Sequence, residues 1–439
     1  MKIILLSGGS GKRLWPLSNG VRSKQFLKLF NAPGGTKESM MQRVVRQIYE
    51  SGIEADIIVA TSKSQHDSVA SQLGNSVDIV AEPMRRDTFP AIALAAMYLS
   101  KEKGVTDDEI VVVMPSDSYT EAGYFEAIKQ MEATIGNNND IDLALIGIKP
   151  KYPSSKFGYI VPSECDAKKA SGFIEKPEIK YAAKLIQKGA LWNGGVFAFR
   201  LKYLKEIVEK YIMVSTFREV CEHYEAFPAI SFDYEVVEKA KSIGIVTYEG
   251  VWKDLGTWDA IADELLSEKI GMVVSSCNSN LIINELSIPL ICNDIHNAII
   301  VAAPDGILVS SCTQVENIKP LVEQIKNRPM HEELMWGKYT VLNAETFDDG
   351  YSILSKEIVI NPGCLISYHR HNHREELWVI ADGIGEIIID GVKKDIRHGD
   401  VVNIAKGQLH AIKAITKLTV MEIQKGELLE EDIEHLPIT

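Results

Sequence analysis

The opening segment constrains the fold most, because an apolar strand runs directly into glycines. Residues 2–7 have the composition of a strand buried on both faces, and Gly8, Gly9 and Gly11 follow at once. Glycines at a strand end let backbone N–H groups approach an anion without obstruction by Cβ atoms. The segment matches neither the P-loop nor the dinucleotide fingerprint. A phosphate-binding loop and a plain tight turn therefore both stay open at this point.

Strands and helices alternate over the next hundred residues. The pattern predicts helices over 39–52, 63–73 and 91–103 and strands over 56–60, 77–81 and 109–114. This alternation indicates an α/β, Rossmann-like domain, with right-handed βαβ units and a parallel sheet covered on both faces. Ligands collect at the carboxyl ends of such strands, so the loops 8–13, 82–90 and 115–118 are the candidate binding loops.

Two aspartates are candidate metal ligands. Asp117 comes directly after the strand expected at 109–114, and Asp254 lies in a turn between Trp252 and Trp258. A single aspartate after a strand is more often part of a turn or a helix cap than a metal ligand. Two carboxylates that converge on triphosphate oxygens would hold Mg²⁺.

The longer string Gly8–Ser18 with Lys24-Gln25-Phe26-Leu27 resembles the signature of mannose-1-phosphate guanylyltransferases, with Lys12 and Ser23 where Thr and Pro are usual. The resemblance implies catalytic roles for Arg13, Lys24, Asp117 and Asp254, with Mg²⁺ on the two aspartates. It implies nucleotide binding by Gly8, Gly9, Gly11, Lys12, Arg13, Glu82, Arg86, Asp87 and Thr88. Asp87 stands where the family usually has Asn, and Phe89 where it usually has Ala.

Further segments resemble the sugar-phosphate elements of the same family. They are Phe157–Ile160, Phe173–Pro177 and Trp192–Phe197, with Asp233-Tyr234 farther along the chain. The implied sugar-phosphate ligands are Gly158, Glu175, Lys176, Asn193 and Asp233. Gly194 replaces the usual Ser.

From about residue 269 the helical periodicity gives way to short β-rich runs at 278–283 and 298–302. Parallel turns stacked as a short left-handed β-helix would suit them, as the family resemblance implies, and spacing alone allows a small sheet as well. A helix is expected over 315–327, and Arg328-Pro329 begins a linker.

The remaining chain reads as an all-β barrel or sandwich, with short strands divided by Gly-containing turns. It holds Gly363-x5-His369-x-His371-x4-Glu376-x6-Gly383 and Gly399-x7-Gly407-x2-His410. Alternate residues of a strand face one side, so His369 and His371 can point together, and Glu376 and His410 could complete a site for Zn²⁺ or another divalent metal. The spacing resembles the two motifs of the cupin (jelly-roll) superfamily, which His373 does not fit.

The whole chain thus resembles long guanylyltransferases whose C-terminal cupin carries type II phosphomannose isomerase activity. The expected domains are a nucleotidyltransferase over 1–268, a β-helical connector and linker helix over 269–330 and a cupin over 331–439. The implied substrates are GTP and mannose 1-phosphate, with mannose 6-phosphate or fructose 6-phosphate in the cupin. The family's isomerase signature has Gln where this chain has His369, and His where this chain has Leu377. The alternative is transfer to another sugar 1-phosphate or from another nucleotide, with the cupin a non-catalytic sugar-binding or dimerisation module.

Composition limits the partners. The net charge of −13 argues against nucleic acid and membrane surfaces, which attract basic faces. The six cysteines are scattered without a CxxC pair, which is typical of reduced thiols. The opening apolar run is too short for a signal segment, and no stretch has the length of a membrane span. We therefore expect a cytoplasmic protein. A homodimer is a separate expectation.

Overall fold

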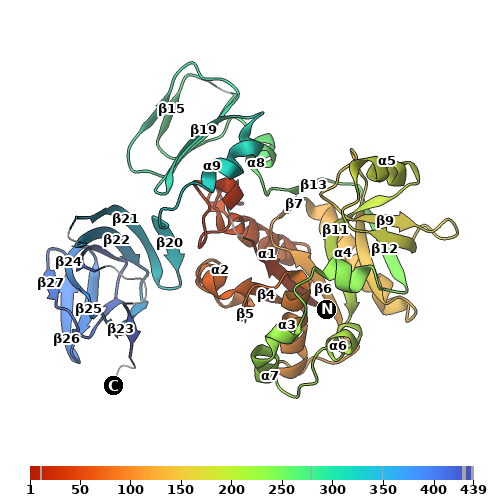
Figure 1. Cartoon of the computed structure of the whole chain (residues 1–439), viewed down its shortest axis with the longest axis horizontal. Coiled ribbons are helices and arrows are strands. Elements are labelled where there is room, and N and C mark those ends of the chain that lie inside the picture. The colour runs from red at the N-terminus through yellow and green to blue at the C-terminus, as the bar shows by residue number, and fades with distance from the viewer. Residues whose placement is uncertain (10–11, 278, 349, 428–431, 437–439) are drawn as a thin grey trace. The chain divides into compact units, whose positions relative to one another are not determined.

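The computed structural model describes residues 1–439 except 10–11, 278, 349, 428–431 and 437–439 (Figure 1). By its contacts the chain divides into two compact units. The first comprises 1–10 and 23–264, and the second comprises 11–22 and 265–439. The middle of the opening signature therefore belongs to the second unit, a division that strand and helix periodicity does not reveal.

The first unit is built on a nine-stranded mixed sheet. Strand β1 (Lys2–Ser7) is central and parallel to both β4 (Asp56–Ser62) and β6 (Ile110–Pro115). The sheet continues through β5 (Asp78–Glu82), β8 (Leu143–Ile148), β9 (Tyr159–Pro162), β10 (Ala170–Ile174), β11 (Leu191–Arg200) and β12 (Ile243–Tyr248). The parallel half, β6-β1-β4-β5, confirms the α/β prediction, and β11 adds antiparallel pairings to β6, β8 and β9.

Alternation along β1 divides the core between the two faces of the sheet. Ile3 and Leu5 belong to one apolar cluster and Ile4 to the other, as expected for a strand with period two. Helices α1 (Met40–Glu50) and α4 (Ala122–Asn137) contribute side chains to the first cluster, and α3 (Thr88–Lys101) and α6 (Leu201–Val208) to the second. Further helices of this unit are α2 (His66–Leu73), α5 (Ile179–Gln187) and α7 (Phe217–Glu222), and α8 (Trp258–Leu265) lies at the boundary.

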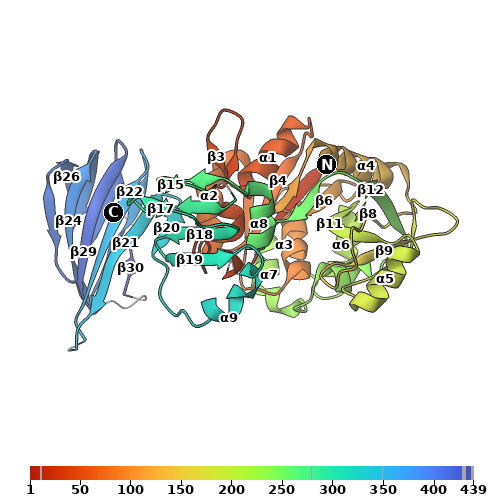
Figure 2. The ribbon, with the colours of Figure 1, turned by 90° about the horizontal axis from the view of Figure 1, so that it is seen from above.

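The second unit begins with two small parallel ladders. One joins β14 (Lys269–Ile270), β16 (Leu281–Asn284) and β18 (Ala298–Ala303), and the other joins β15 (Val273–Ser275) to β17 (Leu290–Cys292) (Figure 2). Successive strands thus stack in parallel, as the β-helical prediction requires, until β19 (Gly306–Ser311) returns antiparallel to β18. We call residues 269–311 the connector.

The helix expected over 315–327 is shorter. A 3₁₀ turn over Val315–Ile318 leads into α9 (Lys319–Val322), where Pro320 occupies the first turn. Proline is tolerated there because an N–H in the first turn has no intrahelical partner, so Pro320 marks a helix start rather than an interior position.

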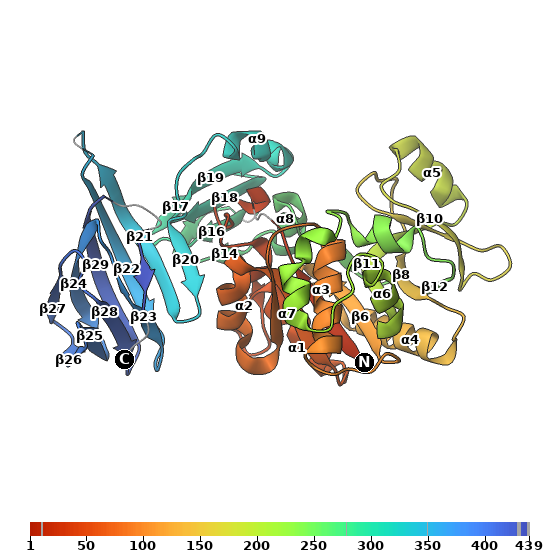
Figure 3. The same ribbon diagram turned by 60° about the horizontal axis from the view of Figure 1, so that its bottom comes forward.

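The rest of the second unit is a sandwich of two antiparallel sheets, the cupin-like fold that the turns predicted (Figure 3). One sheet contains β20 (His331–Leu334), β21 (Gly337–Thr346), β22 (Ser352–Ile360), β29 (Leu418–Gly426), β24 (Arg374–Asp382) and β27 (Val401–Ile404). The other contains β26 (Val392–Arg397), β25 (Ile384–Ile389), β28 (His410–Ala414), β23 (Leu365–Arg370) and β30 (Glu434–His435). Their inner faces share one core, in which Ile358 and Trp378 of the first sheet pack with Ile387 and Ile412 of the second.

Candidate functional site

The first candidate centre joins Lys24, Asp117 and Asp254. A two-stranded ladder pairs β7 (Ser118–Thr120) with β13 (Trp252–Asp254) and sets Asp254 opposite Ser118, the residue after Asp117. Lys24 Nζ lies 2.6 Å from Asp117 Oδ2 and 3.1 Å from Asp254 Oδ1. The structure therefore brings together three of the four residues predicted to be catalytic, although more than 200 positions separate the first from the last.

The centre carries one positive and two negative side chains. Burial alone lowers the pKa of Lys24, but the carboxylates of Asp117 and Asp254 outweigh burial and raise it, so the ammonium stays charged. The two carboxylates that contact Lys24 also provide hard oxygen donors, which Mg²⁺ prefers, so this donor set suits that ion. A Cβ at Gly256 would lie 2.9 Å from Lys24 Nζ and 3.0 Å from Asp254 Oδ1, so glycine keeps this space open.

A buried polar network holds Gly9, at the start of the glycine loop. Gln65 Nε2 donates to the Gly9 carbonyl at 3.1 Å and to Ser23 Oγ at 2.6 Å, and the Ser23 hydroxyl donates to the same carbonyl at 3.2 Å. Gly9 has a φ of 127°, a conformation that favours glycine. Sequence reasoning missed Gln65, because a single glutamine before a helix gives no local signal.

The loop 82–90 is fastened mainly through the side chains predicted to bind nucleotide. Tyr224 donates to Glu82 Oε2 at 2.8 Å, Arg86 Nε donates to the Phe227 carbonyl at 3.0 Å, and Thr88 Oγ1 accepts from Phe232 N at 2.9 Å. Burial raises the pKa of Glu82, although the tyrosine bond opposes this. Asp87 has a φ of 72° and accepts from Thr88 N at 2.7 Å, so it caps α3. These four side chains order the loop before any ligand arrives.

The predicted sugar-phosphate residues form a second cluster in the first unit. Asn193 Nδ2 donates to Asp233 Oδ1 at 2.7 Å, and Lys176 Nζ lies 2.7 Å from Glu175 Oε1. Burial and the neighbouring Glu175 carboxylate raise the pKa of Asp233 to about 7. A Cβ at Gly158 would lie 2.4 Å from Glu175 Oε2, which explains the glycine there. All five residues therefore belong to one polar neighbourhood.

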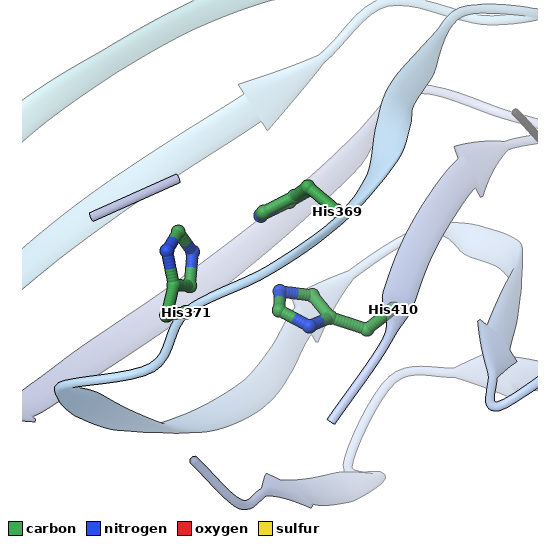
Figure 4. A group of neighbouring side chains, drawn as sticks. All are labelled: His369, His371 and His410. Carbon is green, nitrogen blue, oxygen red and sulfur yellow. The ribbon is translucent and has the colours of Figure 1, made fainter. Parts of the chain in front are cut away.

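The second candidate centre lies in the β-sandwich. His369 on β23, His371 just beyond that strand and His410 on β28 turn their rings toward one another (Figure 4). One ligand atom from each of these three buried residues lies within 4.8 Å of the others. Glu376 on β24 completes the set, with Oε1 3.3 Å from His371 Nε2 and Oε2 3.5 Å from His410 Nε2. The four predicted cupin ligands converge, whereas His373 is exposed and faces Glu427.

The backbone sets the orientation of each imidazole. The Nδ1 atoms of His369, His371 and His410 lie against the carbonyls of Ser367, Asp432 and Gln408. A carbonyl can only accept, so each Nδ1 carries the proton and each Nε2 keeps its lone pair. The lone pair of His371 Nε2 accepts from Arg374 Nη2 at 3.2 Å, so Arg374 has to release this atom before it can bind a metal. Burial lowers the pKa of His369 to about 4 and also lowers that of His371, so both rings are neutral at pH 7.

One buried nitrogen of this cluster has no hydrogen-bond partner among the described residues. His410 Nε2 is buried without a hydrogen-bond donor or acceptor among the described residues, the condition that a bound metal would satisfy. Burial alone raises the pKa of Glu376, but the neighbouring His410 and the charge of Arg374 outweigh burial and hold it below its usual range. A donor set of three imidazoles and one carboxylate is suited to Zn²⁺ or a similar divalent ion.

A shell of residues that sequence reasoning missed supports the cluster. Asp432 accepts through its carboxylate from Asn372 N at 2.8 Å and His373 N at 3.0 Å, so it fixes the turn after His371. Gln424 Nε2 donates to Glu376 Oε1 at 3.1 Å and to Glu422 Oε2 at 3.0 Å. Burial raises the pKa of Glu422. Gln424 and Glu422 alternate along β29, which identifies an inward polar stripe only once the register is known.

The remaining predicted nucleotide-binding residues lie in the opening loop. Gly8 is exposed and follows β1 directly, and Arg13 is exposed on the 3₁₀ turn Lys12–Leu14, within the second unit. Gly11 and the side chain of Lys12 lie outside the described residues. The triphosphate contacts of these residues stay predictions.

Fold and site define a nucleotidyltransferase unit followed by a cupin-type unit, and comparisons with known proteins agree. The nucleotidyl transferase family model matches residues 2–269, and the model of the mannose-6-phosphate isomerase C-terminal domain matches 323–436. The chain therefore belongs to the nucleotidyl transferase family and is an enzyme of that class. The cupin prediction agrees with the second match.

Relatives match the chain over almost its whole length. Mannose-1-phosphate guanylyltransferase RfbM of Salmonella typhimurium is 28% identical over 98% of this chain and 95% of the relative. Mannose-1-phosphate guanylyltransferase of Escherichia coli is 28% identical over 98% and 96%. A crystal structure described as mannose-1-phosphate geranyltransferase from Thermus thermophilus shares the fold, with a TM-score of 0.61 over 74% of this chain and 99% of that one at 24% identity. The resemblance inferred from the signature is confirmed.

Two further predictions concern the cysteines and the membrane. All six cysteines are free thiols. Among the described residues, no helix combines the length and apolar character needed to cross a membrane.

Proposed function

We propose that the first unit transfers GMP from GTP to mannose 1-phosphate and releases pyrophosphate. An oxygen of the sugar phosphate attacks the α-phosphorus of GTP, and the bond from that phosphorus to the leaving pyrophosphate breaks. The nucleophile is already an anion, so the protein's task is to position two anionic substrates and offset their charge. The observation that supports this chemistry is the junction of Lys24 with Asp117 and Asp254.

The residues of this unit divide the work. Lys24, charged and hydrogen-bonded on both sides, would face the triphosphate, while Asp117 and Asp254 would hold Mg²⁺. Bound there, that ion would neutralise phosphate charge. Lys176 and Asn193 would bind the sugar phosphate beside Asp233, and Arg13 would add charge at the nucleotide. Gly8, Gly9, Gly11 and Lys12, together with the loop of Glu82, Arg86, Asp87 and Thr88, would hold the nucleotide.

A coupled pyrophosphate assay tests the proposal. Purified protein receives mannose 1-phosphate with GTP, ATP, CTP or UTP in separate reactions, and glucose 1-phosphate with GTP as the competing sugar. We expect release with GTP and mannose 1-phosphate above all other pairs. A faster reaction with another nucleotide or sugar would contradict the assignment and turn attention to Asp87 and Gly194, where the chain departs from the family pattern.

A second function is supported by the buried cluster of three histidines and Glu376. We propose that it holds a divalent metal and interconverts mannose 6-phosphate and fructose 6-phosphate. The metal would polarise the sugar carbonyl. Around it, Glu376 and the three Nε2 atoms hold fixed positions because Gln424 and the backbone carbonyls constrain them.

The test is formation of mannose 6-phosphate from fructose 6-phosphate by metal-loaded protein. Loss of this activity in His371→Ala, with guanylyl transfer intact, would establish two separate centres. A wild-type protein that binds metal but does not isomerise would leave the cupin as a sugar-binding or dimerisation module. Cytoplasmic location and a homodimer remain part of the proposal. Size-exclusion chromatography with light scattering can test whether the protein is a dimer.

A further inference from the structure

The signature segment, which we define as Arg13–Arg22, is fastened to the connector at three points within the second unit. The first is a close approach of Trp15 to Gly306, the first residue of β19. A Cβ at Gly306 would lie 2.5 Å from Trp15 Cζ2, and the glycine has a φ of 150°. Glycine at this position therefore lets the indole pack directly on the backbone of the connector.

The second point is Asn19. Its side-chain oxygen accepts from Val21 N at 2.9 Å and Arg22 N at 2.7 Å, which closes a turn. Its Nδ2 donates to Asp305 Oδ2 at 2.8 Å, while Asp305 Oδ1 accepts from Met330 N at 2.7 Å. One carboxylate therefore ties the signature segment to the chain that enters the cupin.

The third point is a two-pronged ion pair. Arg22 Nη1 and Nη2 lie 2.7 Å and 2.9 Å from the two oxygens of Glu285. The arginine side chain is only 11% exposed, and the glutamate 28%. Glu285 is itself held, because its N–H donates to the Ala302 carbonyl at 2.8 Å. A bidentate pair of this kind fixes orientation as well as distance.

We propose that Glu285 and Asp305 are positioning residues for guanylyl transfer. This inference rests on the proposed function and adds to it a requirement for the connector. The signature segment carries Arg13 and leads through Arg22 to Lys24, two residues farther on. Fixing Asn19 and Arg22 therefore fixes the course of the chain between the glycine loop and its catalytic lysine. A misplacement of about 1 Å in such a group can cost about 100-fold in rate.

The alternative is that these bonds only hold the connector together. Two readouts separate the two roles: hydrogen–deuterium exchange of the peptide that covers 13–22, and kcat and KM for GTP. The variants are Glu285→Gln and Asp305→Asn, which keep side-chain size, and the charge exchange Arg22→Glu with Glu285→Arg. Glu222→Gln is the matched control, because it weakens an exposed Arg–Glu pair with Arg218 at 2.8 Å.

We expect faster exchange at 13–22 and a 10- to 100-fold lower kcat/KM for GTP in Glu285→Gln and Asp305→Asn, with the cupin metal content unchanged. The single variant Glu285→Arg should lose kcat/KM for GTP, and the charge exchange should recover most of that loss. Glu222→Gln should behave as wild type. Unchanged exchange, or faster exchange with normal kcat/KM, would overturn the inference. Wild-type protein inactive on GTP and mannose 1-phosphate would instead overturn the proposed function, and the exchange data would still decide whether Glu285 and Asp305 hold the segment.

Discussion

The two candidate centres differ in the charge and in the burial of their side chains. In the first unit Lys24 lies between Asp117 and Asp254, whose side chains are 26% and 51% exposed, so the carboxylates already share an internal cation. In the cupin-type unit, His369, His371, His410 and Glu376 are all under 7% exposed, and burial disfavours protonation of the first two rings. Lys24 offsets only one of the two carboxylates of the first centre, whereas the second centre brings neutral imidazoles and one carboxylate together.

This difference indicates how each centre acquires a metal. An exposed carboxylate pair loses little by exchanging partners, so we expect Mg²⁺ to arrive with the nucleotide and leave with pyrophosphate. A buried set of neutral imidazoles with fixed tautomers is preorganised, and the rearrangement that metal binding requires is the release of His371 Nε2 by Arg374. The first centre should therefore be empty after dialysis, and the second should copurify with its ion.

The largest expected effect comes from removing a charge at the exposed centre. Asp117→Ala and Lys24→Ala should each lower kcat for guanylyl transfer by about 100- to 1,000-fold, because each removes one charge that stabilises the reacting phosphates. Steady-state pyrophosphate release measures this. Cupin metal content should not change in either variant.

Asp107→Ala is the control, since Asp107 pairs with Lys205 on the surface, 52% exposed. It should leave kcat within twofold of wild type. A parallel fall in Asp107→Ala, or near-normal turnover in Asp117→Ala, would contradict the assignment of the centre.

The next effect tests the buried centre alone. His371→Ala removes one of the three Nε2 donors, so metal per chain should fall from about one to near zero after dialysis. His373→Ala, two residues away and 52% exposed, should retain the metal. Elemental analysis by plasma mass spectrometry measures both, and guanylyl transfer should persist in both.

If His373→Ala lost as much metal as His371→Ala, the ligand set would be wrong. If His371→Ala abolished guanylyl transfer while its melting temperature was kept, the centres would not be independent, and the contrast between them would fail.

A smaller effect on metal affinity is expected from Asp432, which supports the ligands without being one of them. Asp432→Ala removes the carboxylate that holds Asn372 and His373 N–H groups, so the turn after His371 loosens without loss of a ligand. Loss of such support typically weakens metal affinity by about 10- to 100-fold. Titration against a chelator measures the affinity. Glu434→Ala, which removes only an exposed partner of Arg370, is the control and should not change it.

The sequence predicted the elements of both units and the residues of both centres where spacing or the signature carried the signal. His369 and His371 followed from strand alternation, and Asp117 from its place after β6. It could not predict what depends on long-range register. The pairing of Asp254 with Ser118 needed the β7–β13 ladder, and Gln65, Asp432 and Gln424 gave no local pattern. The contacts of Arg13–Arg22 with the connector were likewise invisible, because they join segments about 260 residues apart.

The smallest effect concerns pH and a third group, Asp233, which contrasts with both centres because burial and Glu175 raise its pKa to about 7. A carboxyl group whose pKa rises on folding from the usual 3.8 favours the folded state at low pH. That stability is lost as pH increases from about 4 to about 7.

Asp233→Asn removes the titration, so the melting temperature of the variant relative to wild type should be higher at pH 8 than at pH 5. Asp56→Asn is the control, because the hydrogen bond and charge of Lys2 lower the pKa of Asp56, so that its carboxyl is ionised at both pH values and the difference from wild type should be the same at pH 5 and pH 8. Thermal scans at both pH values measure the differences, and a pH-independent difference for Asp233→Asn would show that the carboxyl is ionised throughout, like those of the exposed centre.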